Sequence, residues 1–221
     1  MRLNKYVALG TGMSRRDADN AIAEGRIVVD GVRATLGQQV DISNPNIMYD
    51  GEPLTPLPSV VTIMLHKPIG YVCSRDGQGS KTIYDIIPNT YHNLKPVGRL
   101  DKDSSGLLLL TNDGTLAYEL THPSFRKEKT YEVALNRNLT TADYESLTSG
   151  ILLEDGMSKL GLSNDATSKA NWIVKIHEGR NRQIRRTFDS LGYKVIKLHR
   201  TQFGKYSLDN LASGKIMEIS D

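Results

Sequence analysis

Residues 98–111 read Gly98-Arg99-Leu100-Asp101-Lys102-Asp103-Ser104-Ser105-Gly106-Leu107-Leu108-Leu109-Leu110-Thr111, a charged loop that leads into a run of leucines. A short apolar run bounded by turn residues is typical of a buried strand. Asp101 and Asp103 therefore stand directly beside a buried strand, and cations flank them. The pattern fits a surface loop of ion pairs, and it also fits a carboxylate held at the mouth of a cleft.

A bare Asp-x-Asp pair is also compatible with a divalent metal, as in a metal-dependent phosphodiesterase. Such a site needs further acidic or histidine ligands at close spacing. The histidines are instead scattered, at positions 66, 92, 122, 177 and 199. We therefore expect no metal site.

The segments on either side of this loop show strand and helix patterns. We predict strands at residues 60–65, 71–73, 127–133, 172–176 and 195–198. We predict helices at residues 140–150 and 184–191, the second of which Gly192 closes. Alternation in 127–133 places Tyr131 on one face, where a tyrosine is compatible with an ordinary core role.

Positive charge is concentrated late in the chain. The whole sequence carries a net charge of +3, but residues 175–205 hold nine lysines and arginines against two acidic residues. This segment alone is thus +7, and the rest of the chain is −4. Such a concentration suits either a polyanion-binding surface or a solvated helix face.

The first 48 residues predict a compact unit of two helices and a hairpin. Ser14 and Asp17 have capping-box spacing for the second helix, and Gly25 is placed to end it. Asp30-Gly31 is typical of a tight hairpin turn. Arg15 and Arg16 lie in the first turn of the second helix, where cations oppose the helix dipole, which suggests that they bind phosphates.

Half of the eight prolines fall at positions 45, 53, 56 and 58. Proline removes a backbone donor, so we expect no regular element from about residue 44 to 59. We divide the chain into a module at residues 1–48, a proline-rich linker at 49–59 and a larger domain at 60–221.

Composition limits the class of protein. With 221 residues, 38% hydrophobic and 24% charged, the chain is typical of a globular protein with one or two domains. No apolar run approaches the ~20 residues that span a bilayer, and we see no signal peptide. Cys73 is the only cysteine, which excludes an internal disulfide. We expect a cytoplasmic protein.

Two sets of motifs resemble known families. The first 48 residues resemble the S-four-type RNA-binding module, through Arg2 to Tyr6, Ser14 to Ala18, Gly25 and Val29-Asp30-Gly31. The remainder resembles pseudouridine synthases of the RsuA/RluB/RluF type. The matching blocks are Lys67-Pro68-Ile69-Gly70, Gly98 to Asp101 with Gly106 to Gly114, Lys129-Thr130-Tyr131 and Gly179 to Arg186. Residues 2–6, 33–37 and 181–186 look most like the RluF branch.

The resemblance implies an α+β fold. A small N-terminal RNA-binding module would precede a catalytic domain with a mixed, largely antiparallel sheet and a central cleft. The implied reaction converts uridine to pseudouridine in ribosomal RNA, most simply 23S rRNA, without a cofactor. The implied partner is a structured rRNA stem-loop with a flipped uridine, or a pre-ribosomal particle, bound by a monomer. The alternatives are 16S rRNA or another structured RNA, and a non-catalytic ribosome-assembly factor.

The resemblance also implies roles for single residues. Asp101 matches the catalytic aspartate, Tyr131 the residue that stacks on the base, and Arg185 the basic partner of the aspartate. An aspartate has a reference pKa of about 3.9, so it is ionised at neutral pH and can attack carbon or assist glycosidic cleavage. The sequence leaves both routes open. The expected substrate-binding residues are Arg99, Leu198, Arg182, Arg186, Arg15 and Arg16.

Overall fold

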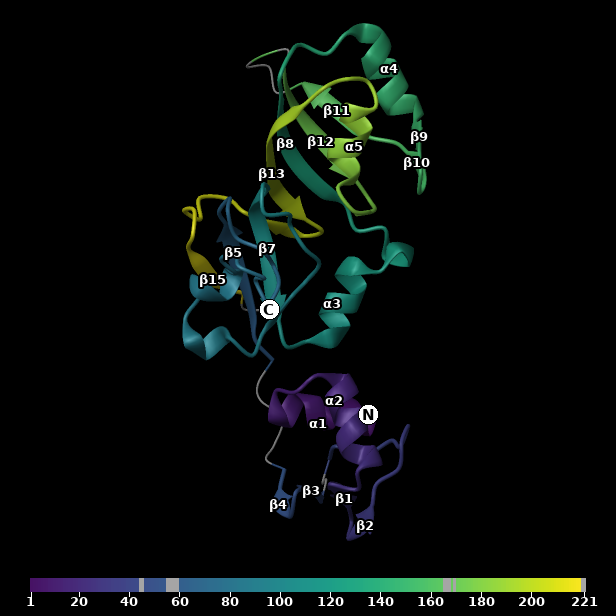
Figure 1. Cartoon of the computed structure of the whole chain (residues 1–221), viewed down its shortest axis with the longest axis vertical. Helices are drawn as coiled ribbons and strands as arrows, with labels where there is room; N and C mark the ends of the chain where they lie inside the picture. The colour runs from purple at the N-terminus through teal and green to yellow at the C-terminus, as the bar shows by residue number, and fades with distance from the viewer. Residues whose placement is uncertain (44–45, 55–59, 165–167, 169, 220–221) are drawn as a thin grey trace. The chain divides into compact units, whose positions relative to one another are not determined.

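The computed structural model describes every residue except 44–45, 55–59, 165–167, 169 and 220–221. The chain forms two compact units, Met1–Val60 and Val61–Asp221 (Figure 1). Each unit has a hydrophobic core of its own. In the described part of the chain, no helix is both long and apolar enough to cross a membrane.

The first unit packs two helices against a small antiparallel sheet. Ser14 accepts a hydrogen bond from the Asp17 backbone N–H, which confirms the predicted capping box. The turn at Asp30 and Gly31 has φ values of 51° and 81°, as the predicted tight hairpin requires. The elements are α1 Leu3–Thr11, α2 Arg15–Ala23, β1 Ile27–Val29, β2 Val32–Arg33, β3 Ile47–Tyr49 and β4 Glu52–Pro53, with strand order β2-β1-β3-β4.

The expectation of no regular element from about residue 44 to 59 is wrong for residues 47–53, and the linker predicted at 49–59 therefore cannot include residues 49–53. These residues form the hairpin of β3 and β4, in which Pro53 pairs with Met48. A proline is tolerated there because β4 is the edge strand, so its missing N–H removes no ladder hydrogen bond. Pro45, Pro56 and Pro58 lie outside the described residues.

In the described part of the second unit, nine strands form one mixed sheet. Its main order is β11-β12-β8-β13-β7-β5-β15, with β14 beside β13 and β6 beside β7. The β13–β7 pairing is parallel and the others are antiparallel, as expected from the resemblance. The strands are β5 Thr62–Lys67, β6 Lys95–Pro96, β7 Ser105–Thr111, β8 Lys129–Leu135, β11 Gly161–Asn164, β12 Asn171–Ile176, β13 Val195–Phe203, β14 Tyr206–Ser207 and β15 Ile216–Glu218.

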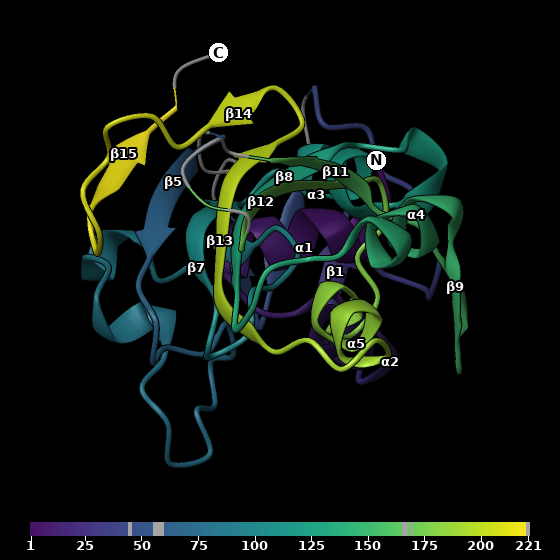
Figure 2. The same cartoon turned by 90° about the horizontal axis from the view of Figure 1, so that it is seen from above.

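Helices cover this sheet, and α4 and α5 lie by its β11–β12–β8 end (Figures 1 and 2). The helical elements are α3 Gly114–Thr121, α4 Thr141–Ser149, α5 Gln183–Asp189 and the 3-10 turns η1 Ile83–Asp85, η2 Asn89–Tyr91 and η3 Pro123–Phe125. A separate hairpin joins β9 Ile151–Leu153 to β10 Gly156–Ser158. The predicted helices at residues 140–150 and 184–191 are thus confirmed as α4 and α5.

The leucine run of β7 is buried on both faces. Leu108 and Leu110 belong to the core cluster on one face, and Leu107 and Leu109 to the cluster on the other. A strand covered on both sides reads as a continuous apolar run rather than an alternating one. Gly106 begins this run with φ 109°, and a Cβ there would lie 2.2 Å from the backbone oxygen of Arg200. The close approach of β7 and β13 therefore requires glycine.

The strand predicted at residues 71–73 is absent from this described region, where Val72 makes only an isolated bridge to Thr82. Cys73 instead contacts the backbone before the Asp101 loop. Its Sγ accepts from the Leu100 N–H at 3.4 Å and donates to the Leu100 oxygen at 3.3 Å. This segment supports the loop rather than extending the sheet.

Candidate active site

A buried lysine holds the loop that follows Leu100 through hydrogen bonds to its backbone. Lys67, at the end of β5, is fully buried and its Nζ donates to the backbone oxygens of Ser104 at 2.7 Å, Asp101 at 3.0 Å and Pro68 at 3.1 Å. Burial lowers the pKa of Lys67, and Cys73, Asp101 and Asp103 partly oppose that effect. A buried cation with three carbonyl acceptors fixes the path of the loop that carries Asp101.

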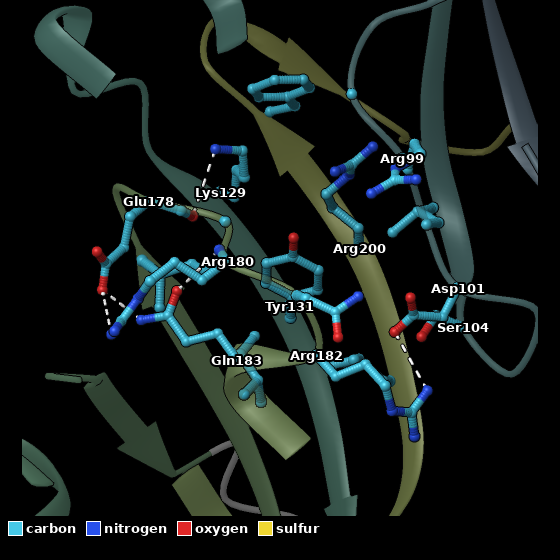
Figure 3. Close-up of a pocket in the computed structure, with 18 of the residues that line it drawn as sticks. Arg99, Asp101, Ser104, Lys129, Tyr131, Glu178, Arg180, Arg182, Gln183 and Arg200 are labelled. Carbon is cyan, nitrogen blue, oxygen red and sulfur yellow. Dashed lines mark hydrogen bonds and ion pairs between the residues drawn. The ribbon is translucent and has the colours of Figure 1, made fainter. Parts of the chain in front are cut away.

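Asp101 faces a cavity of about 550 Å³ (Figure 3). Tyr131 from β8 and Leu198 from β13 form part of its wall, and each is 7% exposed. Ile176 and Ile184 add further apolar surface. The cavity thus combines a carboxylate with an aromatic ring and aliphatic side chains, which suits a flat, polar heterocycle such as a nucleobase.

Arg182 joins the two carboxylates of the loop. Its Nη1 lies 3.4 Å from Oδ2 of Asp101, while Nη1 and Nη2 donate to the Asp103 carboxylate at 3.0 and 3.2 Å. Burial raises the pKa of Asp103, but the hydrogen bonds from Arg182 and the charge of Arg185 outweigh it and hold that pKa below its usual value. Asp103 is therefore an anchor for the guanidinium that reaches Asp101.

Arg185 occupies a different place from the one expected. Its guanidinium pairs with the Asp103 side chain at 3.3 Å rather than with Asp101. It also donates to the backbone oxygens of Asp103 and Val195, both at 2.8 Å. The reason is that α5 begins at Gln183, which leaves Arg182 before the helix and able to reach the cavity, while Arg185 packs beneath the loop. The residue that contacts Asp101 is thus Arg182.

The other expected binding residues divide between the cavity and elsewhere. Arg99 and Arg182 line the cavity. Arg186 instead makes a bidentate pair with Asp155 in the turn between β9 and β10, at 2.6 and 3.1 Å. In the first unit, Arg15 and Arg16 are exposed in the first turn of α2.

Sequence reasoning missed three basic residues in the cavity wall: Arg180, and the strand residues Lys129 and Arg200. Arg200 is 2% exposed, and its Nε donates to the Leu107 oxygen at 2.8 Å. Burial and the charge of Arg200 lower the pKa of Lys129 to about 8. Both residues fall within or beside expected strands, and Lys129 within one of the family motifs, but a strand pattern gives no sign that a lysine or arginine points inward.

The donor set for a metal-dependent phosphodiesterase is missing from the described residues, where no three His, Cys, Asp or Glu side chains gather. Asp103 is already bound by a guanidinium, at hydrogen-bond distance. His66 and His199 do approach one another, with ring centroids 5.1 Å apart. His66 Nδ1 donates to the Leu211 backbone oxygen at 2.6 Å, and His199 Nδ1 shares a hydrogen bond with the Ser105 hydroxyl at 2.9 Å.

Comparisons with known proteins identify the family of the chain. Residues 61–190 match the family described as RNA pseudouridylate synthase, and residues 1–44 match the S4 domain. The ribosomal large subunit pseudouridine synthase B of Bacillus subtilis is 36% identical over 99% of this chain and 92% of its own length. A crystal structure of a pseudouridylate synthase has a TM-score of 0.71 and 32% identity, covering 100% of this chain and 96% of that one.

The dual-specificity RNA pseudouridine synthase RluF of Escherichia coli is 32% identical over 100% of this chain and 76% of its own length. The identity with the B-type relative is higher, so these values do not reproduce the expected greater likeness to RluF. They do confirm the wider RsuA/RluB/RluF group. The chain therefore belongs to the RNA pseudouridylate synthase family, and joins its synthase domain to an N-terminal S4 domain.

Proposed function

We propose that this enzyme isomerises a specific uridine to pseudouridine in ribosomal RNA of the large subunit. The observation that carries the proposal is the cavity in which the Asp101 carboxylate faces Tyr131 and Leu198. The large-subunit enzyme of Bacillus subtilis, similar over nearly its full length, supports the choice of RNA. The substrate is a structured stem-loop, met as free rRNA or in an assembling particle in the cytoplasm, and the enzyme acts as a monomer.

The reaction is an internal rearrangement. The bond between N1 and C1′ breaks, the uracil turns within the cavity, and C5 bonds to C1′. The proton lost from C5 is balanced by one gained at N1, so no group donor is consumed. Asp101 acts as the nucleophile or as the group that assists cleavage and later removes the C5 proton.

The other residues prepare Asp101 and the base for this step. Arg182 places its guanidinium 3.4 Å from the Asp101 carboxylate and holds that side chain at the cavity. Tyr131 stacks on the uracil and Leu198 closes the apolar side. Lys67 and Arg185 act as positioning residues, because both hold backbone carbonyls of the loop.

The uridine must leave its stack to reach Asp101, at a cost of a few kcal/mol. Phosphate contacts offset this cost. Arg15 and Arg16 are exposed in the RNA-binding unit, and Arg99 lies at the cavity. Arg186 acts indirectly, through the hairpin that it holds at Asp155.

The test is pseudouridine mapping of 23S and 16S rRNA treated with the purified enzyme and with Asp101→Asn. We expect a new pseudouridine in 23S rRNA with the wild type, and none with the variant, although the variant binds RNA within a few-fold. Asp189→Asn, at an exposed carboxylate that ends α5, is the matched control and stays active.

Each other result is decisive. RNA binding by the wild type without conversion of either free rRNA or assembling particles would identify an assembly factor instead of an enzyme. A product in 16S rRNA alone would move the substrate to the small subunit. Full activity of Asp101→Asn would remove Asp101 from the mechanism.

A further inference from the structure

Two cations share one aromatic ring in the wall of the cavity. Lys129 begins β8 and Arg200 lies on the neighbouring strand β13. The Lys129 Nζ is 5.1 Å from the centroid of the Phe203 ring, and the Arg200 Cζ is 4.9 Å from it. The ring attracts both charges, but the two cations repel each other across it.

Arg200 is also incompletely bonded. Its Nε reaches the Leu107 oxygen, but its Nη2 is buried and has no hydrogen-bond partner among the described residues. A buried donor without a partner destabilises the fold. Arg200 therefore places a buried positive charge, not fully hydrogen-bonded, beside the cavity.

The carboxylates that could neutralise these cations are committed to other groups. Glu178 follows β12 and binds Arg180 at 3.2 Å and the Gln183 side-chain amide. The Lys129 ammonium donates to the Glu178 backbone oxygen at 3.4 Å, not to its carboxylate. Asp101 is occupied by Arg182. In the described part of the chain, neither Lys129 nor Arg200 forms an ion pair with a carboxylate.

The whole cavity shows the same excess. Its wall contains two acidic residues, Asp101 and Glu178, against five basic ones: Arg99, Lys129, Arg180, Arg182 and Arg200. Figure 3 shows Arg99 beside Arg200, with Lys129 on the same side of Tyr131 and with Asp101 and Arg182 on the other side. The cavity wall therefore has more basic than acidic side chains, and the Asp101 carboxylate contacts Arg182 rather than Lys129 or Arg200.

We propose that Lys129 and Arg200, assisted by Arg99, form an anion site that binds a phosphodiester group of the RNA next to the target uridine. The site rests on the proposed function, since the RNA supplies the anion. The Lys129 ammonium donates to a non-bridging phosphate oxygen, and the buried Arg200 guanidinium adds positive charge beside it. The uracil then occupies the region between Tyr131 and Asp101, so one nucleotide is held at both ends.

The test is the salt dependence of RNA binding by Lys129→Met. Asp101→Asn is introduced into every protein so that turnover does not alter the RNA, a fluorescent 23S rRNA fragment. Loss of one phosphate contact lowers the log–log salt slope by about 0.7 for a single strand, which corresponds to about fivefold weaker binding at 0.1 M relative to 1 M salt. Lys129→Arg keeps the charge and retains the slope.

Lys159→Met is the matched control. It removes one exposed lysine outside the cavity wall, and we expect its slope to match that of the parent. Thermal unfolding separates binding from folding. Because Lys129→Met removes an unpaired, partly buried charge, its Tm should equal or exceed that of the parent.

The pH dependence provides a second readout. Lys129 is faced by Arg200 from β13, by Glu178 from the loop after β12 and by the neutral Phe203 ring. Its pKa of about 8 in the free protein means that it loses its proton as pH rises through 8. A bound phosphate raises that pKa, so affinity should fall above pH 8 in the parent and stay flat in Lys129→Arg.

Three outcomes would overturn the anion site. Weaker binding with an unchanged slope would place Lys129 on the base rather than on a phosphate. If Lys129→Met and Lys159→Met changed the salt slope equally, the change would reflect the lower net charge of the protein and not a phosphate contact of Lys129. Unchanged affinity would remove Lys129 from RNA binding. Failure of the proposed function is a distinct result. It would appear as no pseudouridine formed by the wild-type enzyme, which retains Asp101.

Discussion

Two arginines near the start of α5 serve the Asp101 loop by different means. The Arg182 side chain is 44% exposed and contacts carboxylates, whereas the Arg185 side chain is 12% exposed and bonds backbone oxygens. An exposed ion pair contributes little to folding, but losing a buried donor leaves carbonyls unsatisfied. Arg182 is thus placed to act on the Asp101 carboxylate, and Arg185 to hold the backbone of the loop in position.

Substitution of each arginine by glutamine should separate these roles. We expect Arg182→Gln to lower the single-turnover rate while Tm changes little. Arg185→Gln should cost about 2 kcal/mol of folding free energy, or about 4–8 °C in Tm for a chain of this size. Single-turnover kinetics and calorimetry on both variants check this, and equal Tm losses would contradict the division.

Sequence reasoning reached the cavity through residues whose chemistry is visible in a motif. Asp101, Tyr131, Leu198, Arg99 and Arg182 all line it. The role of Lys67 in β5 was not predicted, because it depends on three backbone carbonyls that come together only in the fold. A lysine is ordinarily a surface residue, so composition and periodicity give no reason to bury one.

At the scale of elements, the tightest constraint lies where β7 meets β13. Gly106 has φ 109°, and the backbone of Arg200 occupies the place of its Cβ. Because β7 follows the Asp101 loop and β13 carries Leu198 and Arg200, this crossing fixes the two sides of the cavity against each other.

Gly106→Ala should therefore be severely destabilising. A side chain cannot fit without separating the parallel pair, so we expect a loss above about 4 kcal/mol or insoluble protein. Gly114→Ala is the matched control, because Gly114 opens α3 with open space around its Cα. That variant should match or slightly exceed the wild type in urea unfolding. A Gly106→Ala protein of normal stability would show that the strands can separate cheaply.

Elements defined by local signals were predictable, and those defined by a distant partner were not. The capping box at Ser14 and Asp17 involves residues three positions apart, so the sequence contains the whole interaction. The strand at Glu52–Pro53 exists because β3 pairs with it at a sheet edge. Proline alone argues for a linker, and only the position at the edge reverses that argument.

For the whole molecule, the two cores indicate a division of labour. The first unit buries Leu3, Tyr6 and Ile22 among its own residues, and the synthase unit has separate clusters around the sheet. Asp101, Tyr131 and Arg182 all belong to the second unit, while Arg15 and Arg16 belong to the first. We therefore expect the first unit to contribute to RNA binding and the second unit to carry out the reaction, and the two contributions can be tested separately.

Removal of residues 1–60 should weaken binding to long rRNA without abolishing the reaction. Arg26 is paired with Glu24 and Asp50. The truncation therefore removes the two phosphate contacts that we propose for Arg15 and Arg16, and the salt slope should fall by about 1.4. At saturating RNA, the truncated enzyme should still form pseudouridine. Single-turnover rates against RNA concentration, for both lengths, measure the two effects apart.

Arg15→Gln with Arg16→Gln in the full chain is the control for this truncation. If the first unit is a tethered binding module, the double variant should reproduce the slope change and keep the maximal rate, since neither side chain belongs to the cavity wall. A different result has a definite meaning. A folded truncated enzyme with a collapsed maximal rate and unchanged affinity would require the first unit to shape the RNA or the active site during the chemical step.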